Sequence, residues 1–382
     1  MKKIYADHAA TTNVDKMVLD SMIPFLNGRY ENPSQPYSGA HQIKKELFLA
    51  RERIARCINA DPEEIFFTSG GTESNNWALY GNTILKNKNS IIITSPIEHH
   101  SISECCKQLS KYGIMTKTVD VDKHGTVDSD SLIRLITDDV AIVSIMLANN
   151  EIGTIQNIKE LVKIAHQHSI LFHTDAVQAL GHIPIDVKDM GVDFLSSSAH
   201  KYNGPKGIGF LYIRKGIDIA PLIVGGSQEN NHRAGTENIA SIVGMSVALK
   251  LNCERMTEFT QKMTELEKVI ISTFEKSDIE FIYNCGQKHI PGLISVSFKN
   301  VSGEMILHRL DLKGILISTG SACNGYNNEI SDVIKSIRVP KEYAEGTIRI
   351  SLGIDNTLED AISIANCIID VIKSMNKVSK HK

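Results

Sequence analysis

The sequence predicts an α/β protein with a mostly parallel sheet, helices on both faces of the sheet, and a second, smaller α/β domain. The first observation is an alternation, from residue 64 onward, of short β-rich apolar runs with helix-length segments, which favours parallel strands joined by helices. The second is the length of 382 residues, which exceeds one ordinary hydrophobic core. The third is a glycine-rich link at 225–236, followed by an apolar helix that continues past Leu251 and joins the domains.

The expected elements follow from the spacing of apolar residues and the positions of Gly and Pro. An extended arm at 5–12 comes first, and a polar loop at 32–39 precedes an amphipathic helix at about 41–59. The strands expected in the first domain are 65–67, 91–93, 140–147, 171–173, 194–195 and 208–213. The second domain is expected to hold strands at 293–298, 315–317 and 347–351 and helices near 302–310 and 358–375.

The composition is that of an ordinary soluble globular protein, with 42% apolar residues, 22% charged residues and a net charge of −3. No nucleic-acid or membrane partner is expected from this balance. The opening residues contain no apolar signal region, and no run approaches the roughly 18 apolar residues of a membrane span, so we expect a cytoplasmic protein. The seven cysteines are odd in number and include no C-x-x-C pair, which predicts reduced thiols and no zinc site.

Polar residues follow five of the expected strands, at the edge where open α/β sheets bind ligands. Each segment alone could be a helix cap or a turn, and Lys201 alone could be a solvated lysine in a glycine-rich turn. Together they contain the groups that would hold pyridoxal 5′-phosphate (PLP). These groups are a phosphate-type loop (Gly71, Thr72), an imidazole (His99), a carboxylate (Asp175), two amides (Asn150, Gln178) and an amine (Lys201).

Each group has a chemical reason to be present. Backbone amides and hydroxyls bind a phosphate, and a carboxylate keeps a pyridine nitrogen protonated. A partly desolvated lysine amine forms a Schiff base with an aldehyde, and an imidazole such as His99 can stack on a pyridine ring. A metal site fits poorly, because the His and Asp residues do not recur at the spacing of metal ligands.

The second domain contributes two candidates that would act on a substrate. Cys323 lies in the small, polar stretch 318–328, which follows a strand and favours a mobile loop whose thiol meets a substrate. An exposed loop cysteine without a role remains an open alternative. Arg349 stands in a strand pattern at 348–353, where its guanidinium could bind a carboxylate bidentately or simply face solvent.

In these motifs, over nearly its whole length, the chain resembles the NifS/IscS-like cysteine desulfurases, within the class V aminotransferases of PLP fold type I. The resemblance implies a large PLP-binding domain at 13–261 with a seven-stranded-type sheet. It also implies a small domain formed by 1–12 and 262–382, which carries the mobile cysteine loop at about 318–330. The reaction implied is conversion of L-cysteine to L-alanine, with the sulfur held as a persulfide on Cys323.

The same resemblance implies a role for each site residue. Lys201 would bind PLP covalently, Asp175 would pair with the pyridine nitrogen, and His99 would stack on the ring and move protons. Gln178 would contact the phenolic oxygen, Asn150 would flank the ring, Gly71, Thr72, Ser198 and His200 would hold the phosphate, and Thr236 would reach in from the other subunit of a homodimer. Arg349 and Asn32 would bind the substrate carboxylate. The sulfur would pass to an acceptor protein, either an iron–sulfur scaffold or a thiolation enzyme.

Two departures from the family pattern lie at the rim of the expected site. Tyr37 and Gln35 replace a histidine and a serine, and the glycine-rich link contains Ser227 and an Asn230-Asn231 pair. The alternative activity is another fold type I reaction, such as that of a selenocysteine lyase or an aminotransferase. Cys323 discriminates, because those reactions need no thiol to accept sulfur. A third reading is a scaffold without activity, which loss of Lys201 or Cys323 would have favoured.

Overall fold

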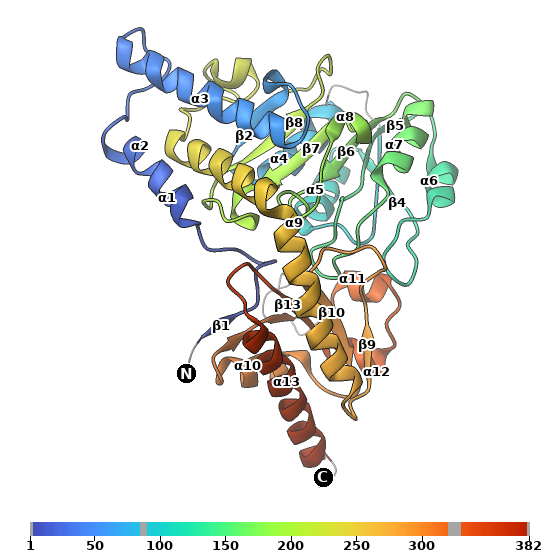
Figure 1. Cartoon of the computed structure of the whole chain (residues 1–382). Coiled ribbons are helices and arrows are strands. Elements are labelled where there is room, and N and C mark those ends of the chain that lie inside the picture. Colours follow the sequence, from blue (N-terminus) through green and yellow to red (C-terminus); the bar gives the residue numbers. More distant parts are fainter. Residues whose placement is uncertain (1–2, 85–89, 320–329, 380–382) are drawn as a thin grey trace.

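The computed structural model describes residues 3–84, 90–319 and 330–379, which contain one large and two smaller sheets (Figure 1). The large sheet has seven strands in the order β2-β8-β7-β6-β5-β3-β4. They are β2 (Ile65–Thr68), β3 (Ile91–Thr94), β4 (Met115–Thr118), β5 (Val140–Ser144), β6 (Leu171–Asp175), β7 (Phe194–Ser198) and β8 (Gly209–Ile213). The predicted α/β class with a mostly parallel sheet is confirmed.

The direction of the strands brings several carboxyl ends to one edge of the large sheet. Strands β4, β3, β5, β6 and β7 pair in parallel. Strand β8 runs antiparallel to both β7 and β2, so β2 points the same way as β7. The residues that follow β2, β3, β5, β6 and β7 therefore share the edge at which ligands bind in such sheets.

Helices cover both faces of the large sheet, as the alternation along β2 shows. Ile65 and Phe67 join one cluster of buried apolar residues, whereas Phe66 between them joins another. The first cluster also takes residues from α3 (Ser38–Cys57), α7 (Ile158–Gln167) and α9 (Ile239–Glu275), and the second from α4 (Gly71–Ile84) and α5 (His100–Ser110). Strands buried on both faces are typical of parallel sheets.

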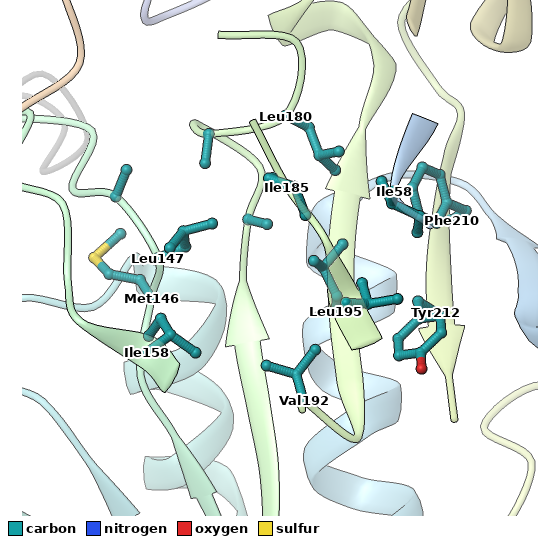
Figure 2. Packing of buried hydrophobic residues seen from close by; sticks show 14 of the residues in the cluster. Ile58, Met146, Leu147, Ile158, Leu180, Ile185, Val192, Leu195, Phe210 and Tyr212 are labelled. Carbon is teal, nitrogen blue, oxygen red and sulfur yellow. The ribbon is translucent and has the colours of Figure 1, made fainter. Parts of the chain in front are cut away.

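The first cluster anchors the strands that carry the site. Figure 2 shows Leu195 on β7 beside Phe210 and Tyr212 on β8, with Ile58 and Val192 packed nearby. All five are buried. Burial of such a side chain stabilises the fold by about 1.5–3 kcal/mol. This packing holds the carboxyl end of β7, and hence Lys201, in place.

The smaller sheets come from the two ends of the chain. One has the order β12-β13-β10-β9, and in the other β1 pairs in parallel with β11. Their strands are β1 (Ile4–Tyr5), β9 (Phe281–Tyr283), β10 (Leu293–Phe298), β11 (Ile315–Leu316), β12 (Ser318–Thr319) and β13 (Thr347–Ser351). The same C-terminal part of the chain contains the helices α10 (Gly303–Asp311), α11 (Asp332–Ser336), α12 (Lys341–Ala344) and α13 (Leu358–Ser379). The N-terminal arm therefore packs with C-terminal residues.

Helix α9 runs from one side of the large sheet to the smaller sheets (Figure 1). Its N-terminal half joins the first cluster through residues such as Val243 and Leu249. Its C-terminal half joins a separate apolar cluster through Leu266 and Phe274, together with β10 and α13. The domain boundaries 13–261 and 1–12 with 262–382 stay predictions.

The remaining helices flank these elements: α1 (Lys16–Met22), α2 (Pro24–Asn27), α6 (Ser129–Leu135) and α8 (Val187–Met190). Several expected bounds differ from the observed ones, and the strand expected at 315–317 is two short strands, β11 and β12. Helix α3 begins three residues earlier than predicted and ends at Cys57, and β5 ends at Ser144 rather than at 147. Strand β4 was not predicted from the sequence. None of the helices in the described ranges combines the length and apolar character that a membrane span requires.

Candidate active site

A cavity of about 320 Å³ lies at the carboxyl edge of the large sheet. Strand β13 of the four-stranded sheet contributes to its lining through Arg349. Most of the residues predicted for the site line this cavity: Gly71, Thr72, His99, Asn150, Asp175, Gln178, Ser198, His200, Lys201 and Arg349. They come from the ends of β2, β3, β5, β6 and β7 and from β13. Residues that are far apart in the sequence thus meet at one place.

Lys201 ends a 3₁₀ turn directly after β7, and its amine is held by the N-terminal arm. Its Nζ donates hydrogen bonds to the carbonyl oxygens of Ala9 at 2.6 Å and Ala10 at 3.0 Å. Two residues further along, the Thr12 amide and hydroxyl both donate to the His200 carbonyl. The arm and the lysine turn therefore form one hydrogen-bonded unit that places the amine in the cavity.

Asp175 ends β6, and its buried carboxylate is oriented by two donors. Asn75 Nδ2 lies 2.6 Å from Asp175 Oδ2, and the Val177 amide donates to Oδ1 at 2.9 Å. The same Asn75 Nδ2 also lies 2.8 Å from Ser101 Oγ. Sequence reasoning gave Asn75 no role, although its position one helical turn after Gly71 places both residues on the same face of α4.

His99 is the N-cap of α5 and faces the cavity as a neutral imidazole. Its Nδ1 accepts a hydrogen bond from the Ser101 amide at 3.1 Å, so the ring proton of the neutral form lies on Nε2. Burial lowers the pKa of His99, and the nearby charge of Lys201 lowers it further, although Asp175 acts in the opposite direction. At neutral pH the imidazole is therefore mainly unprotonated and can accept a proton.

The start of α4 leaves little room for side chains. A Cβ on Gly71 would lie 2.6 Å from Val177 Cγ2, and Gly70 has φ of +149°, which favours glycine. The first amides of a helix have no partner within the helix and attract anions. Ser198 and His200 also line the cavity, and the His200 Nδ1 lies 3.1 Å from the Thr11 hydroxyl.

Arg349 reaches the cavity from β13 and is buried. Its Nη1 donates to the Asn150 carbonyl oxygen and its Nη2 to Asp7 Oδ1, each at 2.8 Å. The third nitrogen, Nε, is buried and has no hydrogen-bond partner among the described residues. Of the two positions that the sequence left open, a surface arginine is excluded, because Arg349 is buried and lines the cavity. Asp7, its partner, was not predicted.

The remaining candidates lie elsewhere. Asn32 and Thr236 are not among the described residues that line the cavity, and Thr236 is exposed. Cys323 and most of the predicted 318–330 loop lie outside the described residues.

Gln178 does line the cavity, and its buried Oε1 finds no partner within the described ranges. In the part of the chain that the structure describes, no group of His, Cys, Asp and Glu residues is arranged to hold a metal ion.

A second cavity of about 460 Å³ adjoins the first and shares His99 and Asn150 with it. Glu98 lines it, although sequence reasoning gave this carboxyl no role. Glu98 Oε1 accepts hydrogen bonds from the Ser95 hydroxyl at 2.5 Å and the Met146 amide at 3.0 Å. Burial raises the pKa of Glu98 to about 8, against the effect of these two hydrogen bonds. Glu98 therefore keeps its proton to a higher pH than an exposed glutamate does.

We expect Glu98→Gln to remove one source of pH dependence in folding stability. The folded-state pKa of about 8 lies above the ordinary value of 4.5, so the unfolded chain loses this proton first as the pH rises. Stability of the parent should then fall between these two values, by up to about 1.4 kcal/mol per pH unit, whereas the variant has no such proton. Urea unfolding of both proteins from pH 5 to 9 measures the difference. A difference that is constant with pH would contradict this expectation.

Comparison with known proteins agrees with this geometry. Residues 4–363 match the family described as Aminotransferase class-V. The chain is 47% identical over 384 residues to the cysteine desulfurase IscS of Dictyoglomus turgidum, an alignment that covers 100% of this chain and 97% of that protein. It is 36% identical over 386 residues to the cysteine desulfurase NifS of Azotobacter vinelandii, covering 100% and 95% of the two chains.

Two solved structures are also similar. A NifS-like protein that is 37% identical superposes with a TM-score of 0.92 and covers 97% of this chain and 100% of that one. A protein described as SspA in complex with cysteine is 36% identical, with a TM-score of 0.82 and coverage of 92% and 99%. Because these similarities extend over nearly all residues, the chain belongs to the class V aminotransferases, which share PLP fold type I, and within them to the NifS/IscS-like cysteine desulfurases.

Proposed function

We propose that the protein is a PLP-dependent cysteine desulfurase that converts L-cysteine to L-alanine and transfers the sulfur to Cys323 as a persulfide. The observation that carries this proposal is the meeting of an amine, a carboxylate, an imidazole and an arginine in one cavity of about 320 Å³. The first three groups suit the cofactor, and the arginine suits an amino-acid carboxylate. A relative of known structure, 36% identical, is described as a complex with cysteine.

The residues of the cavity fit PLP in their chemistry. The glycine cradle at the start of α4 has amides for a phosphate and no space for a larger residue at Gly71. The buried Gln178 Oε1 lacks a partner among the described residues, which suits a ligand with a polar ring substituent. Asp175 offers a carboxylate that is already oriented for a cationic ring nitrogen. When bound, PLP supplies an electron sink for negative charge at the substrate α-carbon.

We propose that the residues predicted from the sequence bind this cofactor. Lys201 would bind it covalently, and Asp175 would keep its ring nitrogen protonated. His99 would stack on the ring, Gln178 would contact its phenolic oxygen, Asn150 would flank it, and Gly71, Thr72, Ser198 and His200 would hold its phosphate. Support for the lysine comes from the two carbonyl oxygens that hold Nζ in the cavity.

The chemistry of the chain's own residues then follows. Arg349 binds the substrate carboxylate and so orients the α-carbon, with Asn32 assisting. The Lys201 amine takes the α-proton, and the neutral His99 is placed to accept a second proton and then return it. The Cys323 thiolate attacks the substrate sulfur, so an S–S bond forms as the C–S bond breaks and its electron pair passes to the substrate carbon. Protonation of that carbon completes alanine.

The products distinguish this reaction from its alternatives. We expect the purified holoenzyme to form one alanine for each sulfur released from L-cysteine in the presence of a thiol reductant. An aminotransferase would instead form a keto acid and load the cofactor with nitrogen. Quantifying alanine, keto acid and sulfide from the same reaction decides between them, and a keto acid as the main product would overturn the proposal.

Asp175→Asn should lower turnover by about 10²–10³-fold without unfolding the protein. The amide oxygen can still accept the hydrogen bond from Asn75, so the local structure is retained. What is lost is the negative charge that would stabilise a protonated ring nitrogen. Alanine formation at saturating cysteine measures the loss, and thermal unfolding of the same samples checks the fold. Turnover within twofold of the parent would refute the role of Asp175.

The biological setting forms the finer part of the proposal. A homodimer in which Thr236 reaches the partner's site agrees with the exposed position of Thr236 outside its own cavity. An acceptor protein for the sulfur, in iron–sulfur assembly or thiolation, is suggested by the NifS and IscS names of the relatives. A cytoplasmic location stays a prediction from the sequence.

A further inference from the structure

We propose that Asp7 determines ligand specificity by occupying Arg349 in the empty enzyme, so that a ligand binds well only if its own carboxylate can replace that of Asp7. This inference rests on the proposed role of Arg349 in binding the substrate. It adds a residue from the N-terminal arm to the substrate site. It also assigns a function to an ion pair between two residues that are 342 positions apart.

The geometry of the guanidinium supports the exchange. Asp7 Oδ1 lies 2.8 Å from Nη2, and the Asn150 carbonyl oxygen occupies Nη1. Nε is buried without a partner among the described residues. Nε and Nη2 form the edge that binds a carboxylate through two parallel hydrogen bonds. Asp7 therefore occupies half of that edge, and a ligand that uses both nitrogens has to displace it.

The main chain of Asp7 is fixed, while its side chain can rotate. Its backbone forms a bridge with Ser351, and its carbonyl accepts hydrogen bonds from the Ala10 amide and the Tyr5 hydroxyl, both at 3.0 Å. The carboxylate is partly exposed, with 19% of the side chain accessible, whereas Arg349 is 5% accessible. Rotation about the Cα–Cβ bond can therefore move the carboxylate toward solvent without unfolding the arm.

The same arm also holds the catalytic amine. Lys201 Nζ donates hydrogen bonds to the carbonyl oxygens of Ala9 and Ala10, two and three residues after Asp7. Residues 7–10 therefore provide partners for both cations of the cavity, Arg349 and Lys201, in the absence of ligand. A substrate replaces the partner of Arg349 with its own carboxylate, so the buried guanidinium keeps a counterion throughout.

The energetic consequence is specific to carboxylates. A buried arginine without a counterion is strongly unfavourable, so Asp7 stabilises the empty site. A ligand carboxylate gains its contacts with Arg349 only in exchange for those of Asp7, which weakens binding. A carboxamide cannot replace the charge, so it is disfavoured. Removing the charge of Asp7 should therefore strengthen the binding of ligands that have a carboxylate. It should leave the binding of ligands that lack one unchanged.

The test is a titration of the holoenzyme with L-alanine and, in parallel, with L-alaninamide, followed by the visible absorbance of the cofactor. In Asp7→Asn we expect the Kd for L-alanine to fall about tenfold, while the Kd for L-alaninamide changes by less than about twofold. Asp355→Asn is the matched control, since this exposed carboxylate lies near the same arm without contacting Arg349. It should leave both Kd values unchanged.

Arg349→Gln separates failure of this inference from failure of the proposed function. If it does not weaken L-alanine binding, the proposed role of Arg349 is wrong. If it weakens L-alanine binding but Asp7→Asn leaves the Kd unchanged or raises it, only the role of Asp7 is overturned. In the Arg349→Gln background, Asp7→Asn should have no further effect on L-alanine binding.

A crystal structure of the parental holoenzyme with L-alanine tests the same exchange without any variant, should Asp7→Asn fold poorly. We expect the ligand carboxylate on Nε and Nη2 of Arg349, with the Asp7 carboxylate rotated away. An intact pair between Asp7 and Arg349 beside the bound ligand would overturn the inference.

Discussion

Lys201→Ala is expected to abolish covalent attachment of the cofactor and to reduce turnover by about 10²–10⁴-fold or more. The lysine amine is the group that the Ala9 and Ala10 carbonyl oxygens hold in the cavity, and alanine ends at Cβ, far short of that point. Borohydride reduction followed by peptide mass spectrometry should find the cofactor on the peptide that contains Lys201 in the parent. The same peptide of the variant should carry none.

Lys206→Ala is the matched control, because this exposed lysine lies five residues further along the same glycine-rich turn. It should keep both the labelled Lys201 peptide and parental turnover. Labelling of a different lysine in the parent, or a Lys201→Ala variant that still turns over cysteine at the parental rate, would refute the assignment of the amine.

Cys323→Ser should retain the cofactor and its visible absorbance, yet form neither alanine nor sulfide at more than about a thousandth of the parental rate. Serine lacks the thiolate that attacks sulfur, whereas the proposed cofactor residues lie on other elements and are unchanged. The reaction is followed as alanine formed from L-cysteine, together with persulfide trapped on the protein by an alkylating reagent and located by mass spectrometry.

Cys367→Ser provides the comparison, since Cys367 is partly buried against the apolar cluster around α13 and has no proposed chemical role. It should form persulfide on Cys323 as the parent does. Sulfide release from Cys323→Ser at the parental rate would contradict the persulfide mechanism while leaving the cofactor assignment intact.

Much of the large sheet could be predicted from the sequence, because its strands are apolar on both faces. Strand β4 could not, since Met115–Thr118 reads as polar and most of its side chains are exposed. It lies at the edge of the sheet and pairs only with β3 in the large sheet's strand order, so no second neighbour requires an apolar pattern. The apolar run after Val140 continues beyond Ser144 because Ile145, Met146 and Leu147 are buried outside the strand.

The site was predictable where polar residues follow strands, and less so where partners come from distant parts of the chain. Lys201, Asp175 and His99 were found because each lies at the end of a strand or within five residues after it. Arg349 could not be told from a surface residue, because its ion-pair partner Asp7 lies 342 positions away in the sequence. Asn75 was missed because an asparagine in the first turns of a helix usually indicates only a cap.

Because the N-terminal arm pairs with β11 and β13, the parts of the structure form in a set order during synthesis. Residues 7–10 leave the ribosome well before Arg349, the partner of Asp7, which follows 342 residues later. At about 5–20 residues per second, that interval lasts roughly 20–70 s. During it the large sheet can assemble, while the arm has neither Ser351 nor Arg349 to bind. The part of the cavity that Arg349 lines therefore forms only after β13 has been translated.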